Sequence, residues 1–362
     1  FVLHLKGSQR ILCTAKIEFR ASEKLLSSVY VGAKLLGIVK PKLNVYLLFS
    51  FNKLNSSLCL CLSLVPGEAL AAEVTSGSCG EGLTWVLEDG TLTISGSGDM
   101  AFESQPWFLS QQEIEKVVVQ AGVTSIADHA FSGCWPLNEI SLPNGLTAIG
   151  AGAFSGSGLK EIDLPASVTT IGESAFAFCG ELEEITIPTK VTALEKNTFT
   201  GCHDLTVVNL PENLTAIGDN TFSGCGMIAL ELPDSVTTIG AEAFSLCEAL
   251  MDITMPKNLV SLGDYAFSGC ISLETIILPD TLTAVNEGLF YNCHLLDQVT
   301  LPKNLISLGD FAFSDCSSLS QLNIPQGTRT IGEGAFTNCS ALETVGIRTI
   351  SPSLWAHISR YS

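Results

Sequence analysis

Phenylalanine, cysteine and proline recur in step along this chain, and their periodicity constrains the fold more than any other feature. A cysteine stands three residues after each phenylalanine of the series, with the single exception of Ser157. A proline follows each of the first nine phenylalanines after 11 or 12 residues. A fixed period of this length indicates one structural unit built repeatedly. The phenylalanines stand 22 or 23 residues apart, at Phe131, Phe154, Phe176, Phe199, Phe222, Phe244, Phe267, Phe290, Phe313 and Phe336.

Each unit contains two short segments with the pattern of extended chain. Residues 182–188 alternate apolar and polar side chains and predict a half-buried strand that a proline ends. Residues 191–194, with equivalents at 168–171 and 236–239, predict a second short strand. Between the strands we expect turns whose glycines adopt positive φ.

One unit alone would leave its Phe and Cys side chains in water, whereas stacked units bury them in a continuous core. The sequence therefore predicts a β-rich solenoid with short strands. At roughly 4.8 Å per coil, some eleven coils would extend over about 50 Å.

The unit reads A-F-x-x-C-x-x-L-x-x-I-x-L-P-x-x-[VL]-T-x-I-G, and it resembles the BspA-type leucine-rich repeat. That repeat occurs in surface proteins of bacteria from animal-associated communities and of some parasitic protists. The resemblance covers residues 111–350 and implies a leucine-rich repeat array. It also implies adhesion to proteins of a host or of neighbouring cells.

Residues 72–110 resemble the N-terminal cap that precedes such repeats in secreted Gram-positive proteins. Independently of the resemblance, residues 83–87 and 91–94 flank Glu88-Asp89-Gly90, which is a β-hairpin signal. A solenoid also needs its first open edge covered. Ile114, Val117 and Val119 then supply a first degenerate strand.

Residues 1–71 have the character of an export signal. A basic flank, the apolar run 58–65 and the small residues of Ala69-Leu70-Ala71 predict cleavage before Ala72. A transmembrane anchor is the weaker alternative because Asn52, Lys53 and Asn55 interrupt the apolar stretch.

The first methionine of the chain is Met100. Either translation starts at a non-AUG codon, or residues 1–40 belong to an incomplete or overextended gene model. At the other end, residues 351–362 leave the repeat pattern as an irregular tail. Either the protein is released, or further sequence follows this tail.

Charge separates the export region from the rest of the chain. Residues 1–71 hold nine basic and three acidic residues, whereas the remainder holds nine basic and 34 acidic ones. So acidic a body repels phosphate groups, which argues against binding of nucleic acid or of anionic membrane lipid.

Ten cysteines follow residue 71. Equivalent cysteines of adjacent coils point in parallel into the core and not toward each other, so we expect a ladder of buried free thiols instead of disulfides. Cys79 has no obvious mate, and its redox state stays open. No cysteine pair has the spacing of a zinc site, and the histidines are isolated. We therefore expect no metal, no cofactor and no catalytic residue.

The surface of the first strand is the remaining candidate for function. Residues on either side of its central apolar residue should face solvent together, and carboxylates gather there in the first six coils. This strip is either a solubilising face or a groove whose acidic half binds a basic protein. Tyr265 and Phe311 are the candidate exposed aromatics. The candidate protein-binding residues are Glu139, Glu161, Asp163, Glu184, Glu231 and Asp252.

We thus expect a secreted or cell-surface repeat protein that binds an extracellular or host surface protein and performs no catalysis. One alternative is a targeting or spacer module of a larger, wall-associated and possibly enzymatic protein. Another is a self-associating structural protein, since an uncapped solenoid exposes strand edges.

Overall fold

The computed structural model describes residues 75–103 and 105–347, except for the side chains of 345–347. The chain divides into two units, Phe1–Glu73 and Val74–Ser362, and every described residue belongs to the second. The export signal predicted in residues 1–71 and the tail at 351–362 lie outside the described residues.

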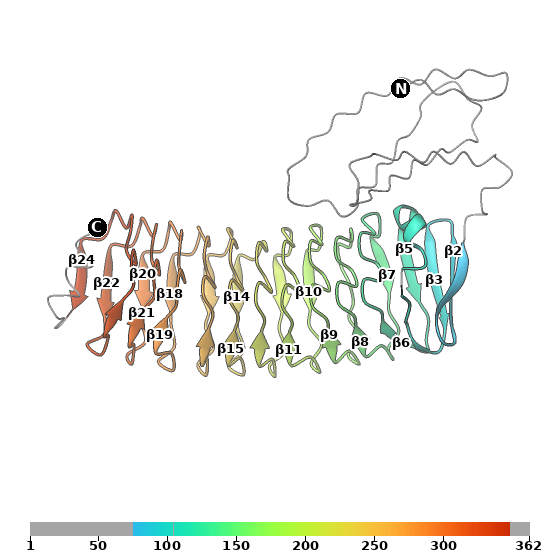
Figure 1. Cartoon of the computed structure of the whole chain (residues 1–362), viewed down its shortest axis with the longest axis horizontal. Helices are drawn as coiled ribbons and strands as arrows, with labels where there is room; N and C mark the ends of the chain where they lie inside the picture. Colours follow the sequence, from blue (N-terminus) through green and yellow to red (C-terminus); the bar gives the residue numbers. More distant parts are fainter. Residues whose placement is uncertain (1–74, 104, 348–362) are drawn as a thin grey trace, which may run out of the picture. The chain divides into compact units, whose positions relative to one another are not determined.

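The second unit is a β-solenoid, as the periodicity predicts, and almost every coil contributes one strand to each of two rows (Figure 1). The first strand row continues from the cap strand β3 and holds the longer strands. It consists of β5 (Lys116–Val119), β7 (Glu139–Ser141), β10 (Glu184–Thr186), β12 (Val207–Asn209), β14 (Ala229–Glu231), β16 (Asp252–Thr254), β18 (Thr275–Ile277), β20 (Gln298–Thr300), β22 (Gln321–Ile324) and β24 (Thr344–Ile347).

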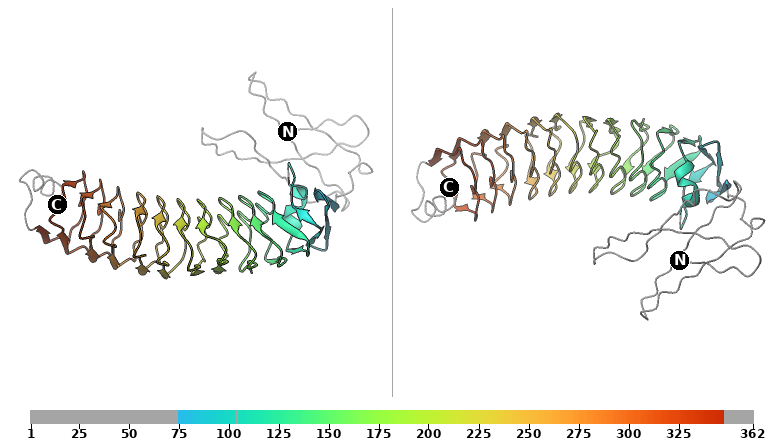
Figure 2. Two further views of the ribbon diagram at one scale, coloured as in Figure 1. Left: turned by 90° about the horizontal axis from the view of Figure 1, so that it is seen from below. Right: turned by 90° about the horizontal axis from the view of Figure 1, so that it is seen from above.

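The second strand row holds mostly two-residue strands, and Figure 2 shows both rows running along the solenoid. It consists of β4 (Gly98–Asp99), β6 (Val123–Ile126), β8 (Ala148–Ile149), β9 (Thr170–Ile171), β11 (Ala193–Leu194), β13 (Ala216–Ile217), β15 (Thr238–Ile239), β17 (Ser261–Leu262), β19 (Ala284–Val285), β21 (Ser307–Leu308) and β23 (Thr330–Ile331). The strands of both rows are shorter than the sequence predicts. Residues 184–186 alone form the strand expected over 182–188.

Strand pairing within the rows is parallel and in the register of the repeat. Ile185 of β10, for example, lies opposite Val208 of β12. The first strand row is nevertheless divided into separate short sheets. Breaks follow β7, where residues 161–163 form no strand, and also β12, β16 and β20.

The two units of 22 residues owe their length to a turn that is one residue shorter after the cysteine position. Gly158 and Gly226 occupy this turn, and each lies against the backbone of the preceding coil. A Cβ atom on Gly226 would stand 2.2 Å from the carbonyl oxygen of His203, and one on Gly158 would stand 2.2 Å from that of Trp135. Only glycine fits this shortened turn.

The third side of each coil is the turn that carries the column phenylalanine. Its backbone N–H groups donate to the next coil, as in the bonds from Phe131 to Ala153 O at 2.7 Å and from Phe176 to Thr198 O at 2.9 Å. The residues two before and two after the phenylalanine have positive φ in all ten coils. The turn therefore satisfies its backbone between coils, without regular secondary structure.

The glycines of the Ile-Gly pairs do not serve the purpose expected from the sequence. Gly172 and Gly218 do not have positive φ; a Cβ atom on either would stand within 2.7 Å of a backbone nitrogen of the previous coil. Here glycine is required by the close approach of neighbouring coils.

The core is a column of stacked aromatic rings beside a column of thiols. The phenylalanine rings stack with centroids 5.3–5.9 Å apart from Phe131 to Phe336. The ladder cysteines are buried and free, as predicted. Each thiol from Cys179 onward donates to the carbonyl oxygen of the column phenylalanine one coil earlier, as Cys247 Sγ does to Phe222 O at 3.1 Å.

The predicted cap is a hairpin that continues both the sheet and the aromatic column. Strands β1 (Ser76–Gly80), β2 (Leu83–Glu88) and β3 (Thr91–Gly96) are antiparallel, and β3 then pairs with β5 in parallel. The 3-10 helix η1 (Phe108–Glu113) follows Trp107. The Trp107 ring stacks on Phe131, and its Nε1 donates to Ala130 O at 2.7 Å.

Candidate protein-binding face

The first strand row presents three exposed positions per coil. The central residue of each short strand is turned inward, while the residues before and after it face solvent, as predicted for Glu184 and Thr186. The residue that precedes the strand is exposed as well in most coils, for example Glu183 and Ile228. We call these three positions together the strand face.

The structure brings the six predicted carboxylates onto the strand face. Glu139, Glu161, Asp163, Glu184, Glu231 and Asp252 are all exposed. Glu161 and Asp163 flank the buried Ile162 although residues 161–163 form no strand.

Two side-chain contacts of these carboxylates were not predicted from the sequence. Lys116 of β5 stands opposite Glu139 in register and forms a salt bridge with it. Asn209 donates its Nδ2 to Glu184 Oε1 and to Thr186 Oγ1, both at 3.0 Å. The repeat period contained the signal for both, because each partner stands 23 or 25 residues from the group it contacts.

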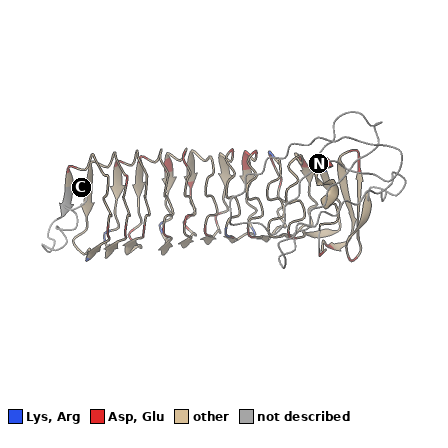
Figure 3. Cartoon of the chain, turned by 45° about the horizontal axis from the view of Figure 1, so that its top comes forward, with Lys and Arg blue, Asp and Glu red and all other residues tan. Residues whose placement is uncertain are grey.

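The exposed position before the strand changes the charge gradient that the two flanking positions suggest. In coils from β18 onward the flanking positions are neutral, but the preceding position carries the exposed Glu274 and Glu343 and the half-buried Asp297. Acidic residues therefore continue along the strand face and outnumber basic ones along the solenoid (Figure 3). The acidic character is not confined to the first six coils.

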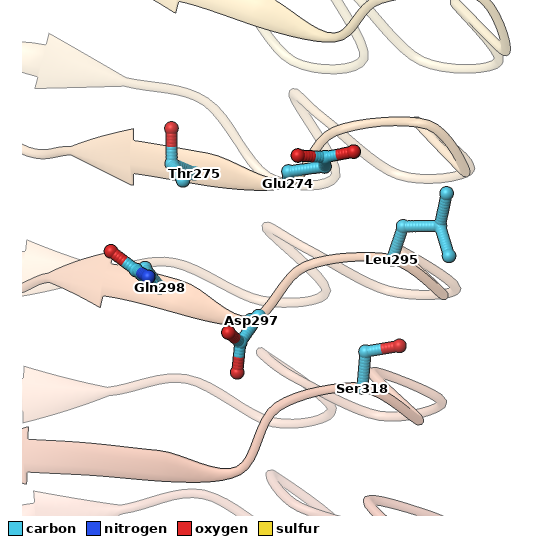
Figure 4. A pocket seen from close by; sticks show the side chains of 6 residues that line it. All are labelled: Glu274, Thr275, Leu295, Asp297, Gln298 and Ser318. Carbon is cyan, nitrogen blue, oxygen red and sulfur yellow. The ribbon is translucent and has the colours of Figure 1, made fainter.

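A pocket of about 300 Å³ lies on the same face between β18 and β22. Its walls come from three consecutive coils (Figure 4). Ser320 donates to Asp297 Oδ1 at 2.8 Å beside it. The lining is Glu274, Thr275, Leu295, Asp297, Gln298 and Ser318.

The two predicted exposed aromatics differ in their surroundings. Phe311 is exposed, whereas Tyr265 is half-buried and donates its hydroxyl to Glu287 Oε1 at 2.8 Å. That hydrogen bond, more than burial, raises the pKa of Tyr265 to about 12. Trp135 and Phe178 are more exposed than either, and neither lies on the strand face.

The thiols offer no nucleophile on the surface. Burial raises the pKa of Cys134, Cys247 and Cys293 to about 12, and that of Cys79 to about 11. The thiolate is the reactive form of cysteine, so burial and a raised pKa both disfavour nucleophilic reaction at these positions.

Within the described residues, no three or more His, Cys, Asp or Glu side chains gather in a way that could hold a metal ion. That part of the chain also contains no helix with the length and apolar character needed to cross a membrane.

A stack of short repeats with two rows of short strands defines a leucine-rich repeat solenoid. The BspA type leucine rich repeat region family matches this chain in six copies, over residues 104–229 and 215–343. The chain belongs to this family.

Solved structures of bacterial leucine-rich repeat proteins are similar to the chain. A leucine-rich repeat protein from Bacteroides ovatus is 25% identical with a TM-score of 0.56, over 73% of this chain and 87% of that one. A leucine-rich cell surface protein from Faecalibacterium prausnitzii is 25% identical with a TM-score of 0.44, over 78% and 97%. Among curated proteins, no match was found.

Proposed function

We propose that this protein is exported and binds an extracellular or host surface protein through the strand face, without catalysis of its own. The observation that carries the proposal is the row of exposed carboxylates along the strand face. Membership of the leucine-rich repeat family supports a protein-binding module. The cell-surface description of the Faecalibacterium protein is consistent with export and adhesion.

The proposal assigns the six carboxylates from Glu139 to Asp252 to contacts with a basic partner. Glu139 should attract a basic partner less strongly than the other five, because Lys116 already forms a salt bridge with it. The other five are in no salt bridge within the described part of the chain. Exposed carboxylates of this kind favour fast, salt-sensitive association with a positively charged surface.

The test compares two triple variants of the full chain for binding to immobilised extracellular-matrix and epithelial surface proteins. One variant replaces Glu161, Asp163 and Glu184 by serine. The matched control replaces three exposed carboxylates away from the strand face. These control residues are Glu195, Glu212 and Glu333.

We expect a salt-sensitive partner whose binding the first variant weakens and the control variant retains. Equal binding by the wild type and the first variant would remove the strand face from the proposal. An equal loss in both variants would indicate a general charge effect.

A further inference from the structure

An apolar cluster interrupts the polar strand face at its centre. Val207, Ile228 and Met251 come from three consecutive coils and are 44%, 54% and 51% exposed. Ala229 is exposed beside Ile228. We call these four residues the apolar anchor.

Neighbouring coils carry polar residues at the same positions of the strand face. Glu183 and Glu184 precede the apolar anchor, and Glu274 and Thr275 follow it. The backbone sets the adjacency of Ile228 and Met251, because Met251 N–H donates to Ile228 O at 2.8 Å. Val207 holds, one coil earlier, the position that Ala229 holds in its own coil, although no strand pairing joins β12 to β14. Apolar side chains in adjacent exposed positions form a patch, which isolated surface residues do not.

Carboxylates surround this patch. Glu183 and Glu184 lie on one side along the solenoid, Asp252 and Glu274 on the other, and Glu231 follows Leu230 within the same strand as Ala229. In the described part of the chain none of these five carboxylates takes part in a salt bridge. Asn209 donates a hydrogen bond to one of them, Glu184.

Apolar surface ringed by unpaired negative charge is complementary to one kind of occupant. Covering Ile228 and Met251 removes apolar area from water, and the exclusion of water strengthens attraction between the carboxylates and positive groups. The same charge repels anionic membrane surfaces. The patch also has no aromatic side chain on which a sugar ring could stack.

We propose that the apolar anchor binds a polypeptide segment in which two apolar side chains are flanked by lysine or arginine. The apolar side chains pack on Val207, Ile228 and Met251, and the basic groups pair with the surrounding carboxylates. Met251 contributes an unbranched, adaptable side chain to this contact. The inference rests on the proposed function and specifies the chemistry of its partner.

The test measures binding of synthetic peptides to the full chain by fluorescence anisotropy. The probe contains Lys-Lys-Leu-Leu-Lys-Lys in a Gly/Ser frame; one comparison peptide has serines for the leucines, and another has glutamates for the lysines. The anchor variant is Ile228→Thr with Met251→Thr. Threonine already occupies this position in a neighbouring coil, at Thr206, so the fold tolerates it.

A matched control makes the same chemical change on the second strand row. Val260 and Ile306 are exposed at positions where Thr237 and Thr283 stand in adjacent coils. The control variant is therefore Val260→Thr with Ile306→Thr.

We expect the wild type to prefer the probe over both comparison peptides. The anchor variant should bind the probe at least tenfold more weakly, while the control variant stays within twofold of the wild type. Added salt should weaken probe binding further because the carboxylate contacts are exposed.

Three results would overturn the inference: no probe binding by the wild type, no preference for leucine over serine, or unchanged binding by the anchor variant. The proposed function stands separately on the extracellular protein panel. If the Glu161, Asp163 and Glu184 variant lost a partner that the anchor variant still bound, the inference would be contradicted and the proposed function would stand. If neither variant bound a panel partner more weakly than the wild type, both the inference and the proposed function would be contradicted.

Discussion

The ring of Phe178 lies against Gly201 of the following coil, so that a Cβ atom on Gly201 would stand 2.7 Å from Phe178 Cδ1. The two residues hold the same place in successive coils, two residues after the column phenylalanine. Both have positive φ, 60° and 73°. Leu246 and Gly269 repeat the arrangement, with a 2.8 Å approach. A large side chain at this position therefore requires glycine in the next coil.

Replacing Gly201 by alanine should destabilise the protein by more than its backbone conformation alone explains. Positive φ costs an alanine about 1 kcal/mol, and overlap with the Phe178 ring adds about 1–3 kcal/mol. Gly224→Ala is the control, because φ is 69° there and the nearest atom to an added Cβ is 3.8 Å away. Chemical denaturation measures both free energies of unfolding.

The double variant Phe178→Asn with Gly201→Ala separates the two contributions. Removing the ring should abolish the overlap, so that the alanine at 201 has only its backbone cost. A double-mutant cycle reports the overlap energy as the coupling energy between the two positions. Equal destabilisation by Gly201→Ala and Gly224→Ala would contradict the steric explanation.

The shortened turn makes a second prediction about glycine. Gly226→Ala should cost about 2 kcal/mol or more, because its Cβ would stand 2.2 Å from the backbone oxygen of His203. Gly180 holds the equivalent place in a 23-residue unit, and nothing lies within 4 Å of an added Cβ. Gly180→Ala should therefore change the free energy of unfolding by less than about 0.5 kcal/mol. Similar costs at the two positions would show that turn length does not decide the requirement.

The thiol ladder predicts that stability falls in alkali. Burial raises the pKa of Cys247 and Cys293 from 9.0 to about 12, so these thiols stay neutral in the folded chain while those of the unfolded chain ionise. Their contribution to the free energy of unfolding is complete below pH 9 and is lost as the pH rises toward 12. Each thiol should lower the free energy of unfolding by about 1.4 kcal/mol per pH unit within that window.

Denaturant unfolding under reducing conditions at a series of pH values measures this slope. In the variant Cys247→Ser with Cys293→Ser, the free energy of unfolding should fall less steeply with pH. The difference in slope should correspond to about two protons fewer released on unfolding. A serine already stands at the ladder position 157, where Ser157 Oγ lies 3.3 Å from Cys179 Sγ, so the fold accommodates serine there. An unaltered slope would mean that these two thiols ionise freely in the folded protein.

Trp107 is expected to determine the stability of the junction between cap and coils. Trp107→Ala removes a buried ring from the start of the aromatic column and should cost about 3–5 kcal/mol. Trp107→Phe keeps the stacking on Phe131 but loses the bond to Ala130 O, which Gln105 also supplies, so about 1 kcal/mol is expected. The exposed Trp135 provides the control: its replacement by alanine should have little effect on thermal or denaturant unfolding.

Much of the architecture is predictable from the amino-acid sequence. The columns of Phe and Cys identify the core, and the alternation around Ile185 predicts which side chains face outward. The hairpin of the cap follows from Glu88-Asp89-Gly90 between two apolar segments. These features are local or periodic, so spacing along the chain is sufficient to find them.

The lateral neighbours along the strand face depend on more than spacing. Lys116 meets Glu139, and Met251 lies beside Ile228, because parallel coils stack in a particular register. The exposure of the position before each strand also widens the face beyond the alternation that the sequence suggests.

The sequence by itself determined the repeat, the buried columns and the outward direction of the six carboxylates, since these follow from the period of the chain. Only the tertiary structure decided which coils approach closely enough to demand glycine. It also showed that the cysteine thiols donate to the phenylalanine carbonyl of the previous coil. Such contacts join residues about one repeat apart, and their distances depend on how the turns stack the coils, which residue types alone do not specify.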